Sequence, residues 1–315
     1  MKAARTETEL RIGGRTLPVS NLGKIFYPKV GFTKGQVIDY YVRVSKWLLP
    51  HLKDRPLTLK RYPNGVEAEF FYEKRCPAHR PKWLKTATIW SEGNQDNIDF
   101  CLANDLPSLV WAANMGDLEM HTFLSKKQSH LRPTMMVFDL DPGPPADILN
   151  CVRVSFWLRE VFDRLGLKSF PKTTGSKGLQ VYVPLNTPVT FDETKSFART
   201  LAQLLTREHP NEVVYDMKKA LRTGKVLVDW SQNDDHKTTV CVYSLRAKES
   251  PTVSTPVIWQ ELEKVERSGN KEQLVFDSDA VLKRVDKMGD LFAPVLTLKQ
   301  KLPKLEEARG LSQAP

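Results

Sequence analysis

The segment MMVFDLDPGPP, residues 135–145, constrains this chain more than any other stretch of its sequence. Apolar residues lead into Asp139 and Asp141, and the Pro-Gly-Pro-Pro that follows interrupts any regular structure. The apolar run predicts a buried β-strand. Because successive side chains of a strand point to opposite faces, the two carboxylates leave the same face and share one site.

Two carboxylates at this spacing repel each other unless a cation compensates their charge. Their oxygens predict a site for Mg²⁺ or Mn²⁺, bound jointly with substrate phosphates as in phosphoryl transfer. An EF-hand is excluded because Gly143 stands where its loop carries an acid. An aspartyl-phosphate enzyme is disfavoured because the same glycine replaces the Thr or Val that should follow the acids. The pair alone also fits a solvated loop, so other residues must decide.

A third carboxylate is expected if two ions are bound, and Asp229 ends the apolar run KVLVD in a similar setting. Taken alone, Asp229 fits a turn or a helix cap better. Between the acids, glycines flank Ser176 and Lys177, so the backbone can fold tightly around an anion. This segment is not a Walker A loop, and it also fits an ordinary hairpin turn.

The charge of the chain favours a polyanionic partner. The formal net charge is +10, and residues 1–60 hold twelve lysines and arginines against four acids. This N-terminal excess indicates either a phosphate-binding platform or an ordinary solvated surface. Arg246, just beyond an apolar run, fits either a triphosphate clamp or a solvated sheet edge.

The composition, 41% hydrophobic and 27% charged residues, is that of an ordinary cytosolic enzyme. We expect no membrane span and no secretory signal, because no apolar run is long enough. The four cysteines are far apart, which predicts reduced thiols and no disulfide. A zinc site built from Cys76 and His79 with Cys101 or His121 is less favoured than ordinary buried cysteines.

Hydrophobic periodicity predicts helices and strands in alternation, joined into largely antiparallel sheets. The expected helices are one from residue 35 that Pro50 ends, one that Asp105 caps, and those at 146–166, 192–209, 256–268 and 279–290. The expected strands lie at 56–65, 68–75, two within 86–103, then 134–141, 168–175, 179–185, 225–230 and 238–245. We interpret residues 1–303 as a single domain with a basic N-terminal lobe, 1–130, and a catalytic lobe, 131–303, followed by a tail, 304–315, that is frayed or a linker stub.

Several long motifs in order now identify a family. FDLDPG, TTGSKGLQVYVPL, KVLVDWSQN, YSLRAK and GDLFAPVLTLKQKLP, with NLGKIFYPKVGFTKGQVIDYY near the N-terminus, resemble the polymerase domain of bacterial ligase D, a branch of the archaeo-eukaryotic primase superfamily. The resemblance covers about residues 10 to 303. It implies an α+β primase-like fold with mixed, largely antiparallel sheets and flanking helices. It also implies a nucleotidyltransferase of non-homologous end joining that fills gaps and extends 3′ ends at 5′-phosphorylated breaks, favouring ribonucleotides.

The resemblance also implies roles for individual residues. The metal-binding and catalytic triad, holding two Mn²⁺ or Mg²⁺ ions, would be Asp139, Asp141 and Asp229. The contacts to the nucleoside triphosphate would be Lys60, Phe71, His121, Ser176, Lys177, Gln232 and Arg246. The contacts to the DNA 5′ phosphate would be Asn21, Lys24 and Lys34. The stacking ring is either Phe70 or Phe71, and Gln180, where many relatives carry His, is left out of the catalytic set.

The expected partners are double-stranded DNA ends and gapped DNA, together with Ku and a DNA ligase, in the prokaryotic cytoplasm and near the nucleoid. No ligase adenylation motif and no nuclease domain occur in this sequence, so the chain is a stand-alone polymerase or a domain of a larger protein. Two alternatives stay open: a primase that starts chains de novo, and a non-catalytic DNA-end-binding module, against which the intact acids argue.

Overall fold

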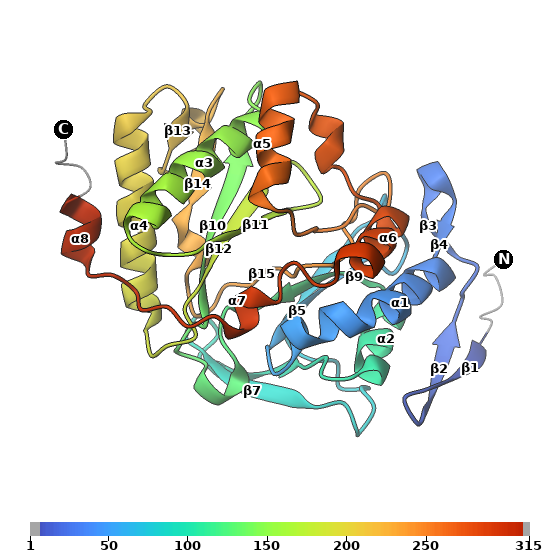
Figure 1. Cartoon of the computed structure of the whole chain (residues 1–315). Coiled ribbons are helices and arrows are strands. Elements are labelled where there is room, and N and C mark those ends of the chain that lie inside the picture. The colour runs from blue at the N-terminus through green and yellow to red at the C-terminus, as the bar shows by residue number, and fades with distance from the viewer. Residues whose placement is uncertain (1–6, 311–315) are drawn as a thin grey trace. The chain divides into compact units, whose positions relative to one another are not determined.

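The computed structural model describes residues 7–310 (Figure 1). These residues divide into two compact units. The first contains residues 7–123, Thr238–Ser254 and Asp277–Gly289, and the second contains Leu124–Lys237, Thr255–Phe276 and residues 290–310. Both units are therefore discontinuous in sequence, whereas the lobes proposed above are continuous. No helix within residues 7–310 is both long enough and apolar enough to cross a bilayer.

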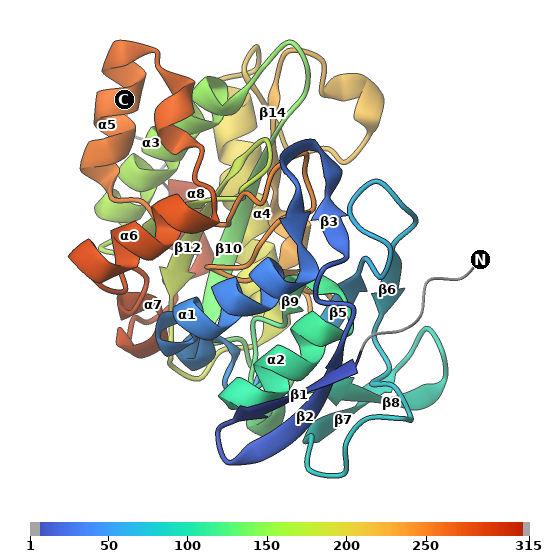
Figure 2. The same ribbon diagram turned by 90° about the vertical axis from the view of Figure 1, so that its right-hand side faces the viewer.

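The first unit is built around an antiparallel sheet in the order β15-β9-β5-β8-β7, with β6 also paired to β5. Its strands are β5 (Leu57–Arg61), β6 (Phe71–Glu73), β7 (Thr86–Ser91), β8 (Asp96–Cys101), β9 (Asp117–Thr122) and β15 (Thr239–Val240). Two smaller hairpins join β1 (Glu7–Ile12) to β2 (Arg15–Ser20) and β3 (Ile25–Tyr27) to β4 (Phe32–Thr33). Figure 2 shows β2 alongside α2 (Leu106–Asn114).

Helix α1 (Lys34–Leu52) begins at Thr33, whose hydroxyl accepts a hydrogen bond from the Gln36 backbone while the Gln36 side chain caps in return. The expected apolar face is buried: Val37, Tyr40, Tyr41, Val44 and Leu48. The prediction that Pro50 ends this helix is wrong. Pro50 is exposed in the last turn, where its missing N–H removes only one hydrogen bond, and Lys53 N still bonds Leu49 O at 3.0 Å.

Two other sequence-based expectations fail in the first unit. Cys76 and Cys101 form a disulfide, with their Cα atoms 5.0 Å apart, so these two thiols are not reduced and are not zinc ligands. Cys76 follows β6 and Cys101 ends β8, and both strands pair with β5, which brings the cysteines together. The strand expected at 238–245 shrinks to β15, because Tyr243 adopts a left-handed backbone with φ 64°.

The second unit is built around a sheet in the order β11-β12-β10-β14-β13, antiparallel except where β13 meets β14. Its strands are β10 (Met135–Pro142), β11 (Phe170–Thr173), β12 (Leu179–Pro184), β13 (Val213–Val214) and β14 (Val226–Asp229). Its helices are α3 (Ile148–Arg164), α4 (Phe191–Glu208), α5 (Trp259–Ser268), α7 (Pro294–Thr297) and α8 (Leu305–Gly310), while α6 (Ser278–Met288) belongs to the first unit. Met136, Phe138 and Leu140 of β10 are fully buried in one core with α3 and α4.

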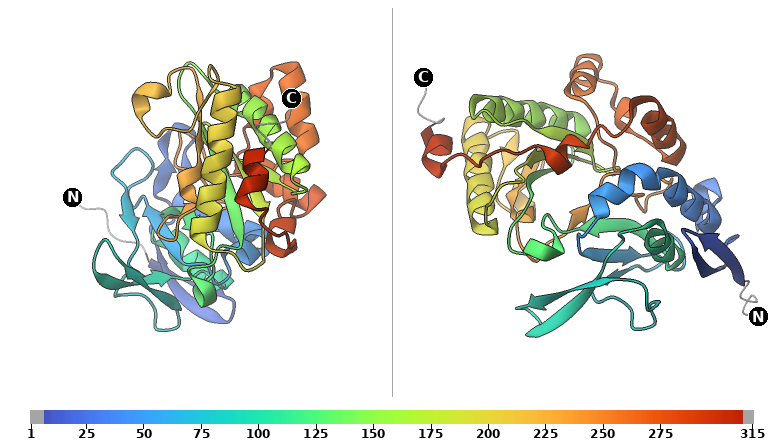
Figure 3. Two further views of the ribbon diagram at one scale, coloured as in Figure 1. Left: turned by 90° about the vertical axis from the view of Figure 1, so that its left-hand side faces the viewer. Right: turned by 60° about the horizontal axis from the view of Figure 1, so that its bottom comes forward.

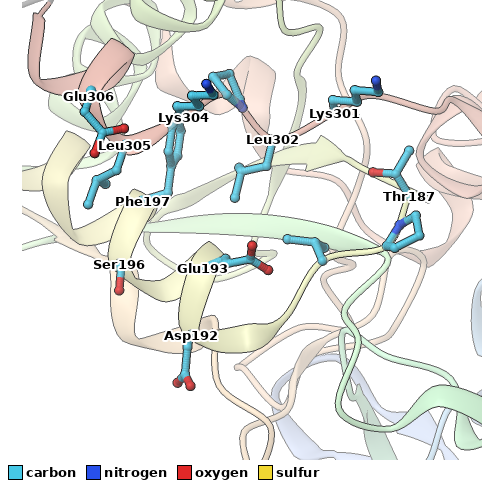
Figure 4. Close-up of a pocket in the computed structure, with 13 residues that line it drawn as sticks. Thr187, Asp192, Glu193, Ser196, Phe197, Lys301, Leu302, Lys304, Leu305 and Glu306 are labelled. Atoms are coloured by element: carbon cyan, nitrogen blue, oxygen red, sulfur yellow. The ribbon is translucent and has the colours of Figure 1, made fainter.

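The C-terminal segment returns to this unit as an ordered element. Helix α8 packs on α4, as Figures 1 and 3 show, so residues 305–310 of the tail that we expected to be frayed or a linker stub form a helix; 311–315 lie outside the described residues. A pocket of about 720 Å³ lies between α4 and residues 301–306, with Phe197, Leu302 and Glu193 in its wall (Figure 4). The residues that line it include none of the site residues predicted from the sequence.

Largely antiparallel sheets with helices packed on them confirm the predicted α+β class.

Candidate active site

The three predicted carboxylates come together on one face of the second unit's sheet. Asp139 on β10 is the direct partner of Asp229 on β14 in an antiparallel pair. Directly opposite residues of such a pair project from the same face, and Asp141 follows two residues later on β10. The acids that the sequence pattern singled out thus lie on two neighbouring strands, near the strand ends.

Two polar residues that the sequence analysis did not assign extend this group across the sheet. Gln180 on β12 lies opposite Asp139, and Lys172 on β11 lies opposite Gln180. The order Lys172, Gln180, Asp139, Asp229 therefore runs across four neighbouring strands. Lys172 is 0% exposed and Gln180 is 2% exposed. The sequence did carry a signal for these two residues: a lysine and a glutamine stand inside otherwise apolar strands. Such residues are rarely buried without a partner.

The carboxyl of Asp139 lies in an unusual electrostatic environment. Burial, and then the charges of Asp141 and Asp229, raise its pKa to about 7, although a hydrogen bond from Gln180 and the charge of Lys172 oppose the shift. Its Oδ1 atom is buried and has no hydrogen-bond partner within residues 7–310. A divalent cation would supply both the missing partner and the compensating charge, so the donor set fits a hard metal ion.

Asp229 is oriented by the residues that follow it. Its Oδ1 accepts hydrogen bonds from the backbone N–H of Ser231 at 2.8 Å and from the Ser231 hydroxyl at 2.6 Å. Its Oδ2 accepts from the side-chain amide of Gln232 at 3.1 Å. Gln232, expected to contact a nucleotide, therefore also supports a carboxylate of the triad.

The glycine-flanked loop between β11 and β12 presents Ser176 and Lys177 at its exposed tip. The hydroxyl of Thr174 accepts hydrogen bonds from the backbone N–H groups of Ser176 and Gly178, both at 3.2 Å, which closes the turn. A Cβ at Gly178 would lie 2.1 Å from the carbonyl oxygen of Leu140, so only glycine fits there. This contact fixes the loop beside the β10 residues that carry the acids.

A cluster of cations lies around a buried carboxylate in the first unit. Glu119 on β9 is the partner of Lys60 on β5, and its Oε2 lies 3.2 Å from Lys60 Nζ. The same oxygen lies 3.0 Å from His121 Nε2 and 3.4 Å from Arg246 Nε. Lys60, His121 and Arg246, all expected nucleotide contacts, therefore meet at one side chain. Glu119 was missed, although an acid inside the strand DLEMHT was a signal.

The cluster shifts the pKa of Glu119 and that of His121. Burial alone would raise the pKa of Glu119, but hydrogen bonding to His121 and the charges of Arg246 and Lys60 hold it well below its usual range. Burial, reinforced by the two cations, lowers the pKa of His121 against the influence of Glu119. An ionised Glu119 only accepts hydrogen bonds, so His121 donates through Nε2.

Aromatic rings surround the Lys60 ammonium. Its Nζ lies 4.7 Å from the ring centre of Phe70, 5.4 Å from that of Tyr62 and 5.5 Å from that of Tyr72. Tyr72 is the strand partner of Lys60, whereas Phe71 is the partner of Arg61 and points to the opposite face of β6. Of the two phenylalanines considered from the sequence, the structure places Phe70 against Lys60 and Phe71 away from it.

The three residues expected at the DNA 5′ phosphate also come together. Asn21 adopts a left-handed backbone, φ 54°, and its carbonyl accepts from Lys24 N at 2.9 Å. Lys34 N bonds Lys24 O at 2.8 Å, which ties this turn to the start of α1. The Lys34 side chain is buried with its ammonium 2.7 Å from Ser20 O, whereas Lys24 Nζ bonds Pro63 O and Asn64 Oδ1, both at 2.7 Å.

Known proteins resemble this chain over most of its length. The family model described as LigD, primase-polymerase domain, matches residues 33–292. The chain belongs to this family. It is 36% identical over 302 residues to the multifunctional non-homologous end joining protein LigD of Mycolicibacterium smegmatis, covering 94% of this chain and 39% of that protein. It is 32% identical over 274 residues to the bifunctional non-homologous end joining protein LigD of Bacillus subtilis, covering 87% of this chain and 43% of that protein.

A solved structure gives the same result at the level of the fold. The polymerase domain of Mycobacterium tuberculosis ligase D in complex with DNA superimposes with a TM-score of 0.82 at 34% identity. The match covers 90% of this chain and 98% of that one, so the resemblance seen in the sequence motifs is confirmed. The chain spans between 29% and 43% of the length of the curated LigD relatives that it matches.

Proposed function

We propose that this LigD primase-polymerase family member is a template-directed nucleotidyltransferase of bacterial non-homologous end joining. It would fill gaps and extend 3′ ends at 5′-phosphorylated DNA breaks, with a preference for ribonucleotides. The observation that carries this proposal is the strand partnership of Asp139 and Asp229, with Asp141 on the same face. Three carboxylates from two strands suit metal-assisted phosphoryl transfer better than simple DNA binding.

Asp139, Asp141 and Asp229 would hold two Mn²⁺ or Mg²⁺ ions. Such ions supply positive charge to the reacting phosphate and to the attacking 3′ oxygen. The chain's own residues orient these ligands: Gln180 hydrogen-bonds the Asp139 carboxyl, and Ser231 hydrogen-bonds that of Asp229.

Binding of the triphosphate would fall to cationic and hydroxyl side chains: Lys60, His121, Ser176, Lys177, Gln232 and Arg246. Phe70, which contacts Lys60, is our choice for the ring that stacks on the base. Asn21, Lys24 and Lys34 would recognise the 5′ phosphate of the break. Lys34 would act indirectly, because its buried ammonium bonds Ser20 O and so holds the turn in position. Ku and a DNA ligase, in the same polypeptide or a separate one, would be the partners on bacterial chromosomal DNA.

The test is primer extension on a gapped duplex that carries a 5′ phosphate, with Mn²⁺ and either ribo- or deoxyribonucleotides. The parent protein is expected to extend the primer, and Asp229→Ala to lose extension by at least about a thousandfold, because one carboxylate of the metal site is removed. Asp163→Ala, which removes an exposed acid of α3, is the matched control and should extend normally. Normal extension by Asp229→Ala would refute the proposal, and synthesis without a primer would favour a primase.

A further inference from the structure

Glu119 is a carboxylate that the proposed mechanism does not use, although Lys60, His121 and Arg246 all contact it. We propose that Glu119 is a positioning residue that holds these three side chains in place as a preformed binding site for the nucleotide triphosphate. The inference rests on the proposed function, since it assumes that a nucleoside triphosphate is the ligand of the cluster.

Burial separates the acid from solvent while leaving the cations partly accessible. The Glu119 side chain is 1% exposed, whereas Lys60 is 13%, His121 14% and Arg246 14% exposed. The Glu119 Oε1 atom accepts a hydrogen bond from the backbone N–H of Ala247 at 3.1 Å, which ties the segment after Arg246 to β9. Glu119 therefore lies behind the cations, where it can orient them without meeting an anionic ligand directly.

The charges at the cluster favour an anion of high charge. Lys60 and Arg246 together carry two positive charges against the single charge of Glu119, so a positive excess remains. Glu73 bonds Arg61, so the charges of these two side chains offset each other. Asp117, two residues earlier on β9, is fully buried, and burial raises its pKa, which favours the neutral form. Neither acid therefore cancels the excess, which suits a polyphosphate.

Holding the cations in advance lowers the cost of binding. A free lysine or arginine side chain loses rotamer entropy when it is fixed, and two cations without a shared anion also repel each other. Because Glu119 fixes the cations when the protein folds, this free-energy cost is not incurred when the ligand binds. A preorganised site gains affinity in this way. It also fixes the ring of His121, because Nε2 donates to Glu119 and Nδ1 is left for the ligand.

The test compares Glu119→Gln and Glu119→Asp with Asp117→Asn, which removes an equally buried carboxylate from the same strand. Calorimetry measures the Kd for the probe, ATP with Mg²⁺. Primer-extension kinetics give KM and kcat separately. We expect Glu119→Gln to raise the Kd for ATP and the KM by about tenfold or more, with a smaller change in kcat. Glu119→Asp keeps the charge and shortens the side chain, so it should fold and show an intermediate loss. Asp117→Asn should bind ATP like the parent.

A titration of the His121 ring by NMR separates positioning from general loosening of the sheet. Glu119 raises the pKa of His121, so this pKa should fall in Glu119→Gln and stay unchanged in Asp117→Asn. ATP binding as tight as the parent's in Glu119→Gln and Glu119→Asp overturns the inference, as does an equal loss in Asp117→Asn. A parent protein that neither extends primers nor binds ATP would instead refute the proposed function.

Discussion

Gln180 lies directly opposite Asp139 in the pairing of β12 with β10, and its side-chain amide hydrogen-bonds the Asp139 carboxyl. Residues that orient a metal ligand commonly contribute 10–100-fold to metal affinity. Gln180→Leu should therefore raise the Mn²⁺ concentration for half-maximal primer extension by about 10–100-fold. Tyr182→Phe, which removes a hydroxyl 3.4 Å from Gln180 Oε1, is the control and should change it little. An unchanged Mn²⁺ requirement in Gln180→Leu would show that the amide does not orient Asp139.

The two neighbouring phenylalanines give a second prediction. Phe70 contacts the Lys60 ammonium and the rings of Tyr62 and Tyr72, whereas Phe71 lies on the Arg61 face of β6. If Phe70 stacks on the incoming base, Phe70→Ala should raise the KM for a ribonucleotide about 5–150-fold. This corresponds to the about 1–3 kcal/mol of binding free energy that stacking contributes. Phe71→Ala should change it less. The reverse order would assign the stacking ring to Phe71.

Local sequence patterns predicted much of the fold because they depend on nearby residues. The helical spacing of Val37, Tyr41 and Leu48 and the cap at Asp105 act within a few residues of the chain. The apolar runs that end in Asp139 and Asp229 likewise predicted two strand ends with acids. Their direct partnership is a matter of sheet register, which those runs alone do not specify.

The missed disulfide and the missed buried residues involve partners that are distant in the sequence. Cys76 meets Cys101 only because β6 and β8 both pair with β5. Lys172 and Glu119 look like solvated strand residues until the neighbouring strands are known, and both are buried. Local patterns carry no information on which strands become neighbours, so these contacts required the structure.

The disulfide should stabilise the protein measurably. It closes a loop between residues 25 apart in the sequence, for which chain entropy gives about 3.5 kcal/mol of stabilisation. Reduction with dithiothreitol should lower the Tm of the parent, and the double variant Cys76→Ser with Cys101→Ser should melt at the lower temperature with or without reductant. Thiol counting checks that reduction is complete. A parent Tm that does not change on complete reduction would contradict this stabilisation.

The turn that holds Lys24 predicts a salt-dependent preference for phosphorylated ends. Lys24→Ala should reduce the preference for a 5′-phosphorylated gap over a 5′-hydroxyl gap, and lower the slope of log affinity against log salt by about 1. Lys46→Ala, at an exposed position of α1, is the matched control for net charge. Equal effects of the two variants would mean that the charge acts through the general field and not at the 5′ phosphate.

The start of α3 predicts a pH-dependent contribution to stability. Asp147 caps this helix by accepting from Leu149 N at 2.9 Å, and Lys271 Nζ lies 3.0 Å from its other oxygen. Burial is the largest single influence on the pKa of Asp147 and raises it, but the hydrogen bonds from Lys271 and the helix N–H groups together outweigh burial, so the pKa lies below its ordinary 3.8. The cap is fully effective above the unfolded-state pKa and is lost as the pH falls through the folded-state pKa.

Asp147→Ala should therefore lower the free energy of unfolding at pH 7 by about 1 kcal/mol, and the difference from the parent should shrink below about pH 4. Lys271→Ala separates the helix cap from the ion pair. That pair is exposed and screened by solvent, so Lys271→Ala should destabilise the protein much less than Asp147→Ala. Urea unfolding of the three proteins at pH 7 and pH 3.5 provides the measurement. A deficit in Asp147→Ala that persists unchanged at acid pH would mean that the ionised carboxylate is not what stabilises the helix start.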